Sequence, residues 1–307
     1  MGLRLHDRHG VGTPEIGVVV AGVASPRVSH VPLLTPTTVR SLIEAHDLHP
    51  SRALGQHYLA DPNTARRIVR LSGVEAGDHV LEIGPGVGSL TLALVDAGAE
   101  VVALELDRRL VPVLDGVVGD RARVVVGDAT TVDLEACIGE LHASRPYRCV
   151  SNLPYNVATN VVVRLLETAP RIEHIFVMVQ REVGERLAAT PGGKEYGAVS
   201  VKVAYYATAE VVGTVPPTVF VPKPKVDSAL VRLTRRDEPP VEVPSSQRLF
   251  ELSRAGFAQR RKTLRRSLAP VLGDRAGEVL SNAGVDPSAR AETLDLEQWA
   301  AVTRAAA

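Results

Sequence analysis

Cysteine is nearly absent from this sequence. The 307 residues include only Cys137 and Cys149, which make no metal-binding motif. Two cysteines in a chain of this length are also not the disulfide framework of a small secreted protein, and they resemble reduced cytosolic thiols. We therefore expect two reduced thiols, no metal ion and a cytoplasmic location.

A net charge is also lacking, because 35 basic residues are balanced by 35 acidic ones. The chain as a whole is not attracted to nucleic acid, so a basic surface for such a partner must be local. Lysine is scarce, and arginine supplies most of the basic residues. No apolar run approaches the length of a membrane span, and we expect no membrane partner.

The first 35 residues carry little that can be interpreted. Residues 16–24 form a short apolar run that resembles a signal peptide, but Asp7 and Glu15 do not fit a positively charged leader. We expect residues 1–35 to be a flexible N-terminal extension, or the result of a start codon assigned too early. A short helix is then predicted over residues 35–47, capped by Thr35 or Thr37.

From His79 onward, short apolar runs alternate with helical patterns, which is typical of an α/β domain. At 45% hydrophobic residues the chain is able to bury a sizeable core. Helices are predicted over residues 63–71 and 89–97. Strands are predicted over residues 79–83, 100–106, 123–126, 148–151, 174–179, 200–207 and 228–233.

Functional residue types follow the first three predicted strands. Gly84 and Gly86 belong to a glycine-rich turn that lets a ligand approach the backbone closely. Glu105 ends the second strand, where it is placed to bind ribose hydroxyls, and Asp128 follows the third, where it could accept from an adenine amino group. The glycine spacing differs from the dinucleotide fingerprint, which disfavours an NAD oxidoreductase. Together the residues predict a nucleotide-like cofactor.

The fourth strand leads into Asn152-Leu153-Pro154-Tyr155, which suits methylation of an adenine amino group. The N6 lone pair of adenine is delocalised into the ring, so this nitrogen is a poor nucleophile. Two acceptors, the Asn152 side-chain oxygen and the Leu153 carbonyl, would hold both N6 hydrogens and favour a lone pair directed at an electrophile. Pro154 fixes its φ angle, and Tyr155 offers a face on which a base stacks. The alternative is an ordinary surface turn.

Residues 216–227 are rich in proline and predict a stiff loop. Phe220 could close a base sandwich opposite Tyr155, with Lys223 and Lys225 near phosphates. The alternative is a packed loop in which Phe220 belongs to the core.

A linker over residues 235–246 suggests a domain boundary. We expect a methyltransferase domain over residues 36–236 and a helical domain over residues 245–307, with one helix predicted over residues 247–272. Residues 253–273 contain no acid, which fits an anionic partner, RNA more than DNA. The basic residues of this acid-free segment are Arg254, Arg260, Arg261, Lys262, Arg265 and Arg266.

Over roughly residues 35–305 the chain resembles the KsgA-type rRNA adenine N6,N6-dimethyltransferases. The matching pieces are Leu54–Leu59, Glu82–Gly86, Glu105–Asp107, Asn152–Asn156, Gln180–Val183, Phe220–Ser228 and Phe257–Thr263. The resemblance implies a Rossmann-like class I methyltransferase sheet with helices on both faces, a small C-terminal all-α domain, and S-adenosylmethionine as methyl donor. It also implies two adjacent adenines near the 3′ end of 16S rRNA as substrate, within an immature small ribosomal subunit in the bacterial cytoplasm. We expect a monomer.

The family pattern also implies a cofactor site, although the sequence departs from it at one place. Bacterial members usually carry Asn-Phe where this chain has His57-Tyr58. The residues implied in the site are His57, Leu59, Gly84, Glu105, Asp128 and Asn152.

Two rivals from other classes stay open. The antibiotic-resistance branch methylates a large-subunit adenine and tends to carry Ile in place of Leu153. A non-catalytic factor that only binds pre-ribosomes is disfavoured by the full set from Asn152 to Tyr155.

Overall fold

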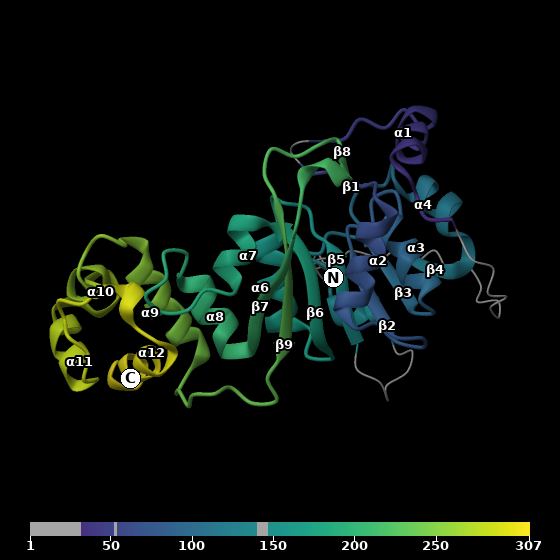
Figure 1. Ribbon diagram of the computed structural model, residues 1–307. Coiled ribbons are helices and arrows are strands. Elements are labelled where there is room, and N and C mark those ends of the chain that lie inside the picture. The colour runs from purple at the N-terminus through teal and green to yellow at the C-terminus, as the bar shows by residue number, and fades with distance from the viewer. Residues whose placement is uncertain (1–31, 52–53, 140–146) are drawn as a thin grey trace, which may run out of the picture.

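A seven-stranded mixed sheet forms the centre of the protein (Figure 1). The computed structural model describes residues 32–51, 54–139 and 147–307. Five neighbouring strands are parallel, and β9 runs antiparallel to both of its neighbours. In spatial order the strands are β4 (Ala122–Val126), β3 (Glu100–Glu105), β2 (His79–Ile83), β5 (Tyr147–Asn152), β6 (Ile172–Gln180), β9 (Ser228–Arg235) and β7 (Ala207–Val215).

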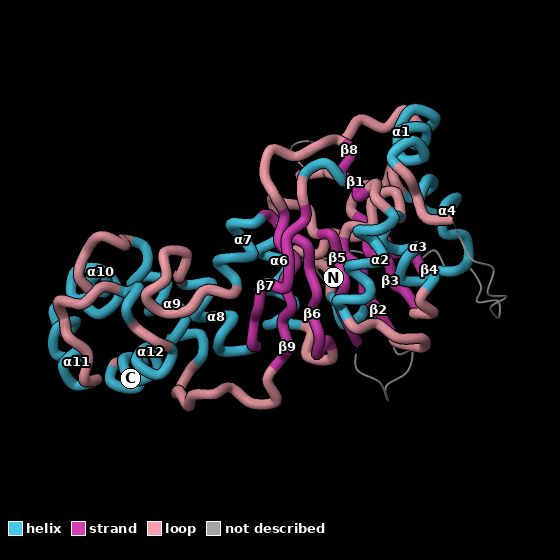
Figure 2. The backbone as a smooth tube through the Cα atoms, in the orientation of Figure 1, coloured by secondary structure: helices cyan, strands magenta, loops and turns pink. Residues whose placement is uncertain are grey.

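Alternate residues of the strands belong to two hydrophobic cores, one on each face of the sheet. In β3, Val101 and Ala103 pack on one side while Val102 and Leu104 pack on the other. Helices therefore cover both faces, as predicted (Figure 2). The first core includes α1 (Pro36–Ala45), α2 (Pro62–Ser72), α3 (Ser89–Asp96) and α4 (Val111–Val118), and the second includes α5 (Leu134–Ile138), α6 (Ala158–Thr168) and α7 (Arg181–Leu187).

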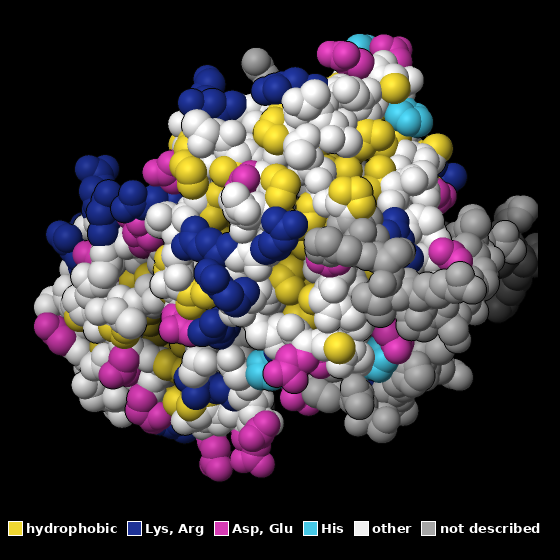
Figure 3. All heavy atoms as spheres, turned by 45° about the vertical axis from the view of Figure 1, so that its right-hand side comes forward, with side chains coloured by type: hydrophobic (Ala, Val, Ile, Leu, Met, Phe, Trp, Pro, Cys, Tyr) yellow, Lys and Arg dark blue, Asp and Glu magenta, His cyan; other side chains and the backbone are white. Residues whose placement is uncertain are grey.

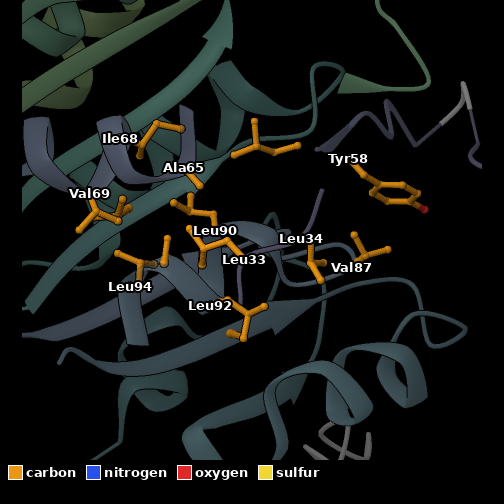
Figure 4. Close-up of a cluster of buried hydrophobic side chains, with 14 of the residues drawn as sticks. Leu33, Leu34, Tyr58, Ala65, Ile68, Val69, Val87, Leu90, Leu92 and Leu94 are labelled. Carbon is orange, nitrogen blue, oxygen red and sulfur yellow. The ribbon is translucent and has the colours of Figure 1, made fainter. Parts of the chain in front are cut away.

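The first core also fixes the N-terminal end of the described chain. Ile68 and Val69 of α2 lie close to Leu90 and Leu94 of α3, with Leu33 in the same cluster (Figure 4). Leu33 and Leu34 are buried, although the sequence placed both in a flexible extension. The rest of that extension, residues 1–31, lies outside the described residues.

The order of the strands reverses between β2 and β5, where a parallel sheet offers a ligand crevice. Pairing between these strands is limited to His79–Leu81 against Tyr147–Cys149. Beyond that point the Ile83 amide donates to the Ser151 hydroxyl at 2.8 Å, so a side chain replaces the backbone ladder. The carboxyl ends of β2 and β5 therefore flank a crevice.

A separate pair of two-residue strands ties the start of the domain to the proline-rich loop. β1 (Tyr58–Leu59) runs antiparallel to β8 (Phe220–Val221). The peptide bond between Val221 and Pro222 is cis. This pairing holds two segments far apart in the sequence beside each other at the same end of the sheet (Figure 1).

The C-terminal residues form helices around a third core. The helices are α9 (Ser246–Ala258), α10 (Leu264–Leu272), α11 (Ala276–Asn282) and α12 (Leu296–Ala305). Trp299 is fully buried, and a Cβ atom on Gly256 would lie 2.5 Å from its indole ring. Glycine at position 256 therefore allows α9 and α12 to pack closely.

Two sequence predictions are wrong. Residues 200–207 were predicted as a strand, but they lie mainly in α8 (Ala198–Tyr206), whose start is capped by Ser200. The single helix predicted over residues 247–272 is two helices, α9 and α10, separated by residues 259–263. The helix expected over residues 35–47 and its Thr35 cap are confirmed. In the described part of the chain, no helix is long and apolar enough to cross a membrane.

Candidate active site

A cleft opens at the carboxyl ends of β2, β3 and β5. Each of these strands delivers residues to it, and the segment before β1 covers one side. Its lining includes most of the predicted cofactor residues, namely His57, Leu59, Gly84, Gly86, Glu105 and Asn152, together with Leu153, Pro154 and Tyr155.

Glycines shape the cleft where β2 ends. Gly84 and Gly86 both have positive φ angles, of 70° and 60°. A Cβ atom on Gly84 would lie 3.1 Å from the Pro154 ring, and one on Gly86 would lie 2.9 Å from the Tyr58 ring. Larger residues here would therefore be strained and would push on both walls of the cleft.

Glu105 is nearly buried and its carboxylate binds the glycine turn. One oxygen accepts from the Gly86 amide at 3.1 Å, and the other accepts from the Asp107 amide at 2.8 Å. These bonds do not use all the lone pairs of the two oxygens, so the carboxylate can still accept from an incoming donor. Burial raises the pKa of Glu105 to about 7, against the opposing effect of these hydrogen bonds. The group is therefore poised between its neutral and charged forms near neutral pH.

The side chain of Asn152 has a defined orientation. Its Nδ2 donates to the His57 carbonyl at 3.1 Å. Because a carbonyl can only accept, the amide nitrogen faces His57 and Oδ1 stays available as an acceptor. The Leu153 amide donates to the Met178 carbonyl at 3.1 Å, and the Leu153 side chain is buried. The start of the Asn-Leu-Pro-Tyr motif is thus fixed to β6.

Tyr155 is held at both ends. Its hydroxyl lies 2.6 Å from the Ser228 hydroxyl, and its ring centre lies 5.2 Å from that of His57. Burial raises the pKa of Tyr155, so the phenol stays neutral at physiological pH. The His57 ring in turn has its Nδ1 atom 2.8 Å from the Pro222 carbonyl. His57 therefore contacts both the Asn-Leu-Pro-Tyr motif and the proline-rich loop.

Sequence reasoning missed Glu82 and Ser89, which also line the cleft. Glu82 is fully buried, and burial raises the pKa of its carboxyl to about 8. Within the described residues, Glu82 Oε2 and the Ser89 hydroxyl have no hydrogen-bond partner. The sequence does carry a signal for Glu82, because it is a carboxylate within the mainly apolar run of β2. Buried polar groups without partners are costly, so such a residue suggests a role in binding.

Gln56 was missed as well. Its Nε2 atom donates to Asp107 at 3.0 Å, while its Oε1 atom accepts from the Ser51 amide at 2.8 Å. Asp107 also pairs with Arg109, whose hydrogen bond holds the pKa of the Asp107 carboxyl at about 2. This charged group therefore fastens the segment before β1 over the cleft at all physiological pH values.

Two predicted residues are not among those that line the cleft. Phe220 is 3% exposed and belongs to the first core, so the packed-loop alternative describes its position. Asp128 lies just beyond β4, where its Oδ1 atom accepts from the Thr130 amide and hydroxyl at 2.8 and 2.7 Å. The aromatic ring beside Tyr155 is that of His57, with the two ring centres 5.2 Å apart, and the predicted pairing with Phe220 is not formed.

The basic residues proposed for RNA binding are exposed. Lys223 and Lys225 lie on the loop after β8. Arg260 donates to the Lys194 carbonyl at 2.8 Å and lies 3.5 Å from Glu292, so part of its charge is compensated. The remaining predicted residues are also exposed. They lie between α9 and α10 or in the first turn of α10, and they are Arg261, Lys262, Arg265 and Arg266.

Comparison with known proteins gives a consistent result over most of the chain. A family model described as ribosomal RNA adenine dimethylase matches residues 49–307. The ribosomal RNA small subunit methyltransferase A of Leifsonia xyli is 48% identical over 87% of this chain and 96% of its own. The protein of the same name from Thermobifida fusca is 47% identical over 88% of this chain and 95% of its own.

Solved structures agree with the fold. The 23S rRNA methyltransferase ErmE is 29% identical, with a TM-score of 0.60 over 81% of this chain and 98% of its own. A dimethyladenosine transferase from Plasmodium falciparum has a TM-score of 0.66 at 23% identity, over 80% of this chain and 96% of its own. The sheet is therefore that of a class I S-adenosylmethionine-dependent methyltransferase, as predicted. Because the family model matches residues 49–307 and these relatives are 48% and 47% identical, this chain belongs to the ribosomal RNA adenine dimethylase family.

Proposed function

We propose that the protein dimethylates N6 of two adjacent adenines in the 3′-terminal hairpin of 16S rRNA, with S-adenosylmethionine as methyl donor. The observation that carries this proposal is the placement of Asn152 to Tyr155 beside the glycine turn at the crevice between β2 and β5. The relatives named as small subunit methyltransferases support the choice of substrate, because at 48% and 47% identity they are nearer to this chain than ErmE is at 29%.

The cleft residues fit the cofactor. The buried, unpartnered Glu82 Oε2 and Ser89 Oγ atoms offer polar groups to an incoming ligand that has donors and a positive charge. Glu105 has lone pairs to accept from two ribose hydroxyls, and the backbone at Gly84 and Gly86 leaves room for close approach. Leu59 and His57 complete this set, and Asp128 beyond β4 is proposed for the adenine amino group. When bound, S-adenosylmethionine supplies an electrophilic methyl group.

The catalytic residues orient the substrate amine. A target base must leave its stack or come from a loop to enter such a cleft. Asn152 Oδ1 and the Leu153 carbonyl accept from the N6 hydrogens, which directs the lone pair toward the methyl donor. The amine becomes acidic only as the methyl transfers, so no general base is needed at first and catalysis depends on position. After the first methylation one of the two acceptors loses its partner.

Tyr155 stacks on the target base in this proposal, and its substitutions separate the ring from the hydroxyl. Tyr155→Phe is expected to keep turnover within about threefold, because stacking survives and only the hydrogen bond to Ser228 is lost, roughly 0.5–1.5 kcal/mol. Tyr155→Ala is expected to weaken substrate capture by roughly 1–3 kcal/mol. Steady-state methylation of purified subunits measures both effects. Equal losses in the two variants would contradict a stacking role.

The basic segment, residues 254–266, is proposed to dock on the rRNA of the immature subunit, with Lys223 and Lys225 near phosphates. Reversal of Arg261 and Arg265 to Glu is expected to weaken binding to small subunits and to flatten its salt dependence, because fewer counterions are released. Cofactor affinity is expected to stay unchanged, since these residues are remote from the cleft lining. Titration of labelled subunits at several salt concentrations measures the first effect and calorimetry the second. An equal loss of cofactor affinity would mean that the segment is structural.

Mass spectrometry of rRNA tests the function itself. The purified protein, S-adenosylmethionine and unmethylated small subunits are expected to give two N6,N6-dimethyladenosines per 16S rRNA. Modification of large-subunit rRNA instead, with resistance to drugs that bind there, would favour the alternative activity. We further propose that the protein acts as a monomer in the cytoplasm, and that residues 36–236 and 245–307 are its two domains.

A further inference from the structure

The exposed face of α2 carries three arginines and no acid. Arg66 and Arg70 are exposed and Arg67 is half-buried, at spacings of three and four residues that put them on one side of the helix. The opposite side, with Ala65, Ile68 and Val69, is buried in the first core. Like charges four residues apart destabilise a helix slightly, so helix stability does not explain this choice of residues.

These charges are not neutralised by the acids nearest in the chain. In the described part of the protein no carboxylate forms an ion pair with Arg66, Arg67 or Arg70. Asp61 is engaged in capping α2, where it accepts from the Thr64 amide at 2.8 Å. Arg67 donates to the Thr214 carbonyl at 2.9 Å, a bond that fixes the guanidinium without removing its charge.

The surface continues past the C-terminal end of α2 into a hollow. Ser72 and Gly73 line it together with Arg148, Arg232 and Thr234. Arg148 pairs with Asp78 at 2.8 Å, and Arg232 pairs with Glu210 at 2.6 Å. His174 also faces the hollow, and burial, with the nearby Arg148, lowers its pKa, so it adds no charge at neutral pH. The local excess of positive charge therefore comes from α2.

We propose that this α2 face, residues Arg66, Arg67 and Arg70, is a second RNA-binding surface that holds the phosphate backbone of an rRNA helix. Figure 3 shows a band of Lys and Arg side chains across the middle of one face of the molecule. Guanidinium groups suit phosphate oxygens, and the absence of aromatic residues from α2 favours contact with the backbone over base stacking.

The position of α2 gives this surface its role. The helix begins at Pro62, three residues after Leu59 of the cleft lining. RNA bound along α2 would therefore lead to the cleft, on a surface separate from residues 254–266. The inference rests on the proposed function, because it names a further contact for the same substrate.

The test is a charge reversal, Arg66→Glu with Arg70→Glu, in the full-length protein. The matched control is Arg66→Lys with Arg70→Lys, which keeps both charges. The affinity for unmethylated small subunits is expected to fall about tenfold or more in the Glu variant, and the slope of log affinity against log salt is expected to shrink by about 2. The Lys variant is expected to keep both values, and S-adenosylmethionine affinity and the melting temperature are expected to stay constant.

Three results would overturn the inference. The first is an unchanged affinity and salt slope in the Glu variant. The second is an equal loss of affinity in the Lys variant. The third is a Glu variant that binds subunits poorly but binds a protein-free rRNA hairpin as tightly as the wild type does. The last result would assign the surface to an acidic ribosomal protein. Failure of the wild-type protein to methylate small subunits would instead contradict the proposed function, so the two failures are distinguishable.

Discussion

Replacement of Asn152 by Ala is expected to slow methyl transfer by roughly 30- to 1000-fold, an increase of about 2–4 kcal/mol in the barrier. In the wild type, Asn152 Nδ2 donates to the His57 carbonyl, so Oδ1 points away from His57. The variant loses this Oδ1 acceptor. Cofactor affinity is expected to change much less, because the glycine turn and Glu105 stay in place. Single-turnover methylation of unmethylated small subunits measures the chemical step, and calorimetry measures cofactor binding.

Two further variants make the Asn152 result specific. Asn160→Ala removes an exposed carboxamide in the nearby helix α6 and is expected to keep the wild-type rate. Asn152→Asp keeps an acceptor but places a carboxylate oxygen against the His57 carbonyl, so it is expected to be slow as well. Near-wild-type turnover of Asn152→Ala would reduce the Asn-Leu-Pro-Tyr motif to a surface turn.

Removal of the Glu105 side chain is expected to weaken S-adenosylmethionine binding by about 1–3 kcal/mol, roughly 5- to 150-fold in affinity. In the proposed site the carboxylate accepts from the ribose hydroxyls, and it also accepts from the Gly86 amide at 3.1 Å. Isothermal titration of the Glu105→Ala variant measures the loss. Glu100→Ala, at the opposite end of the same strand, is the matched control and is expected to bind normally. An unchanged affinity in Glu105→Ala would sink the assignment.

The pH dependence of cofactor binding gives an independent check on Glu105. The ionised carboxylate is the stronger acceptor, and burial raises the pKa of this group to about 7. Affinity is therefore expected to rise between about pH 6 and pH 8, as Glu105 loses its proton. Glu105→Gln is expected to remove much of this rise. Burial raises the pKa of Glu82 to about 8, so a rise that remains in Glu105→Gln is expected to be centred near pH 8.

The sheet was predictable because its strands are short apolar runs that end in glycine or polar residues. The pattern over residues 200–207 is that of a strand, although the segment is mainly helical, and the reason is physical. α8 lies between two cores, with Val203 in the second and Val201 and Tyr205 in the third. A helix buried on opposite sides places apolar residues at alternate positions here, which is the pattern of a strand.

The break between α9 and α10 has little local signal. Residues 259–263 contain neither glycine nor proline, and only Thr263 suggests the start of a helix. Distant carbonyls complete the turn, since the amides of Leu264 and Arg265 donate to Ala289 and Pro287 at 2.8 and 3.1 Å. The basic residues thus lie on a helix end, a turn and a helix start, which presents them in more directions than one helix would.

The site was predictable where chemistry is concentrated in short motifs and less so where burial decides. Gly84, Glu105 and Asn152 lie at the carboxyl ends of β2, β3 and β5, which are neighbours in the sheet, so sheet topology alone brings them together. Phe220 has the aromatic ring that a base sandwich requires, but pairing of its strand with β1 places it in the core. The link from Gln56 to Asp107 depends on a contact across 51 positions and leaves no periodic pattern in the sequence.

The position of α8 limits how the protein can be divided. Its residues Val201 and Tyr205 complete the core of the C-terminal helices, although α8 precedes the last strands of the sheet in the chain. A fragment that ends at the linker would expose these side chains to water, and transplanted C-terminal helices would meet a foreign partner surface. Exchange of C-terminal regions between relatives is therefore expected to give soluble chimaeras only when the matching α8 residues are exchanged with them.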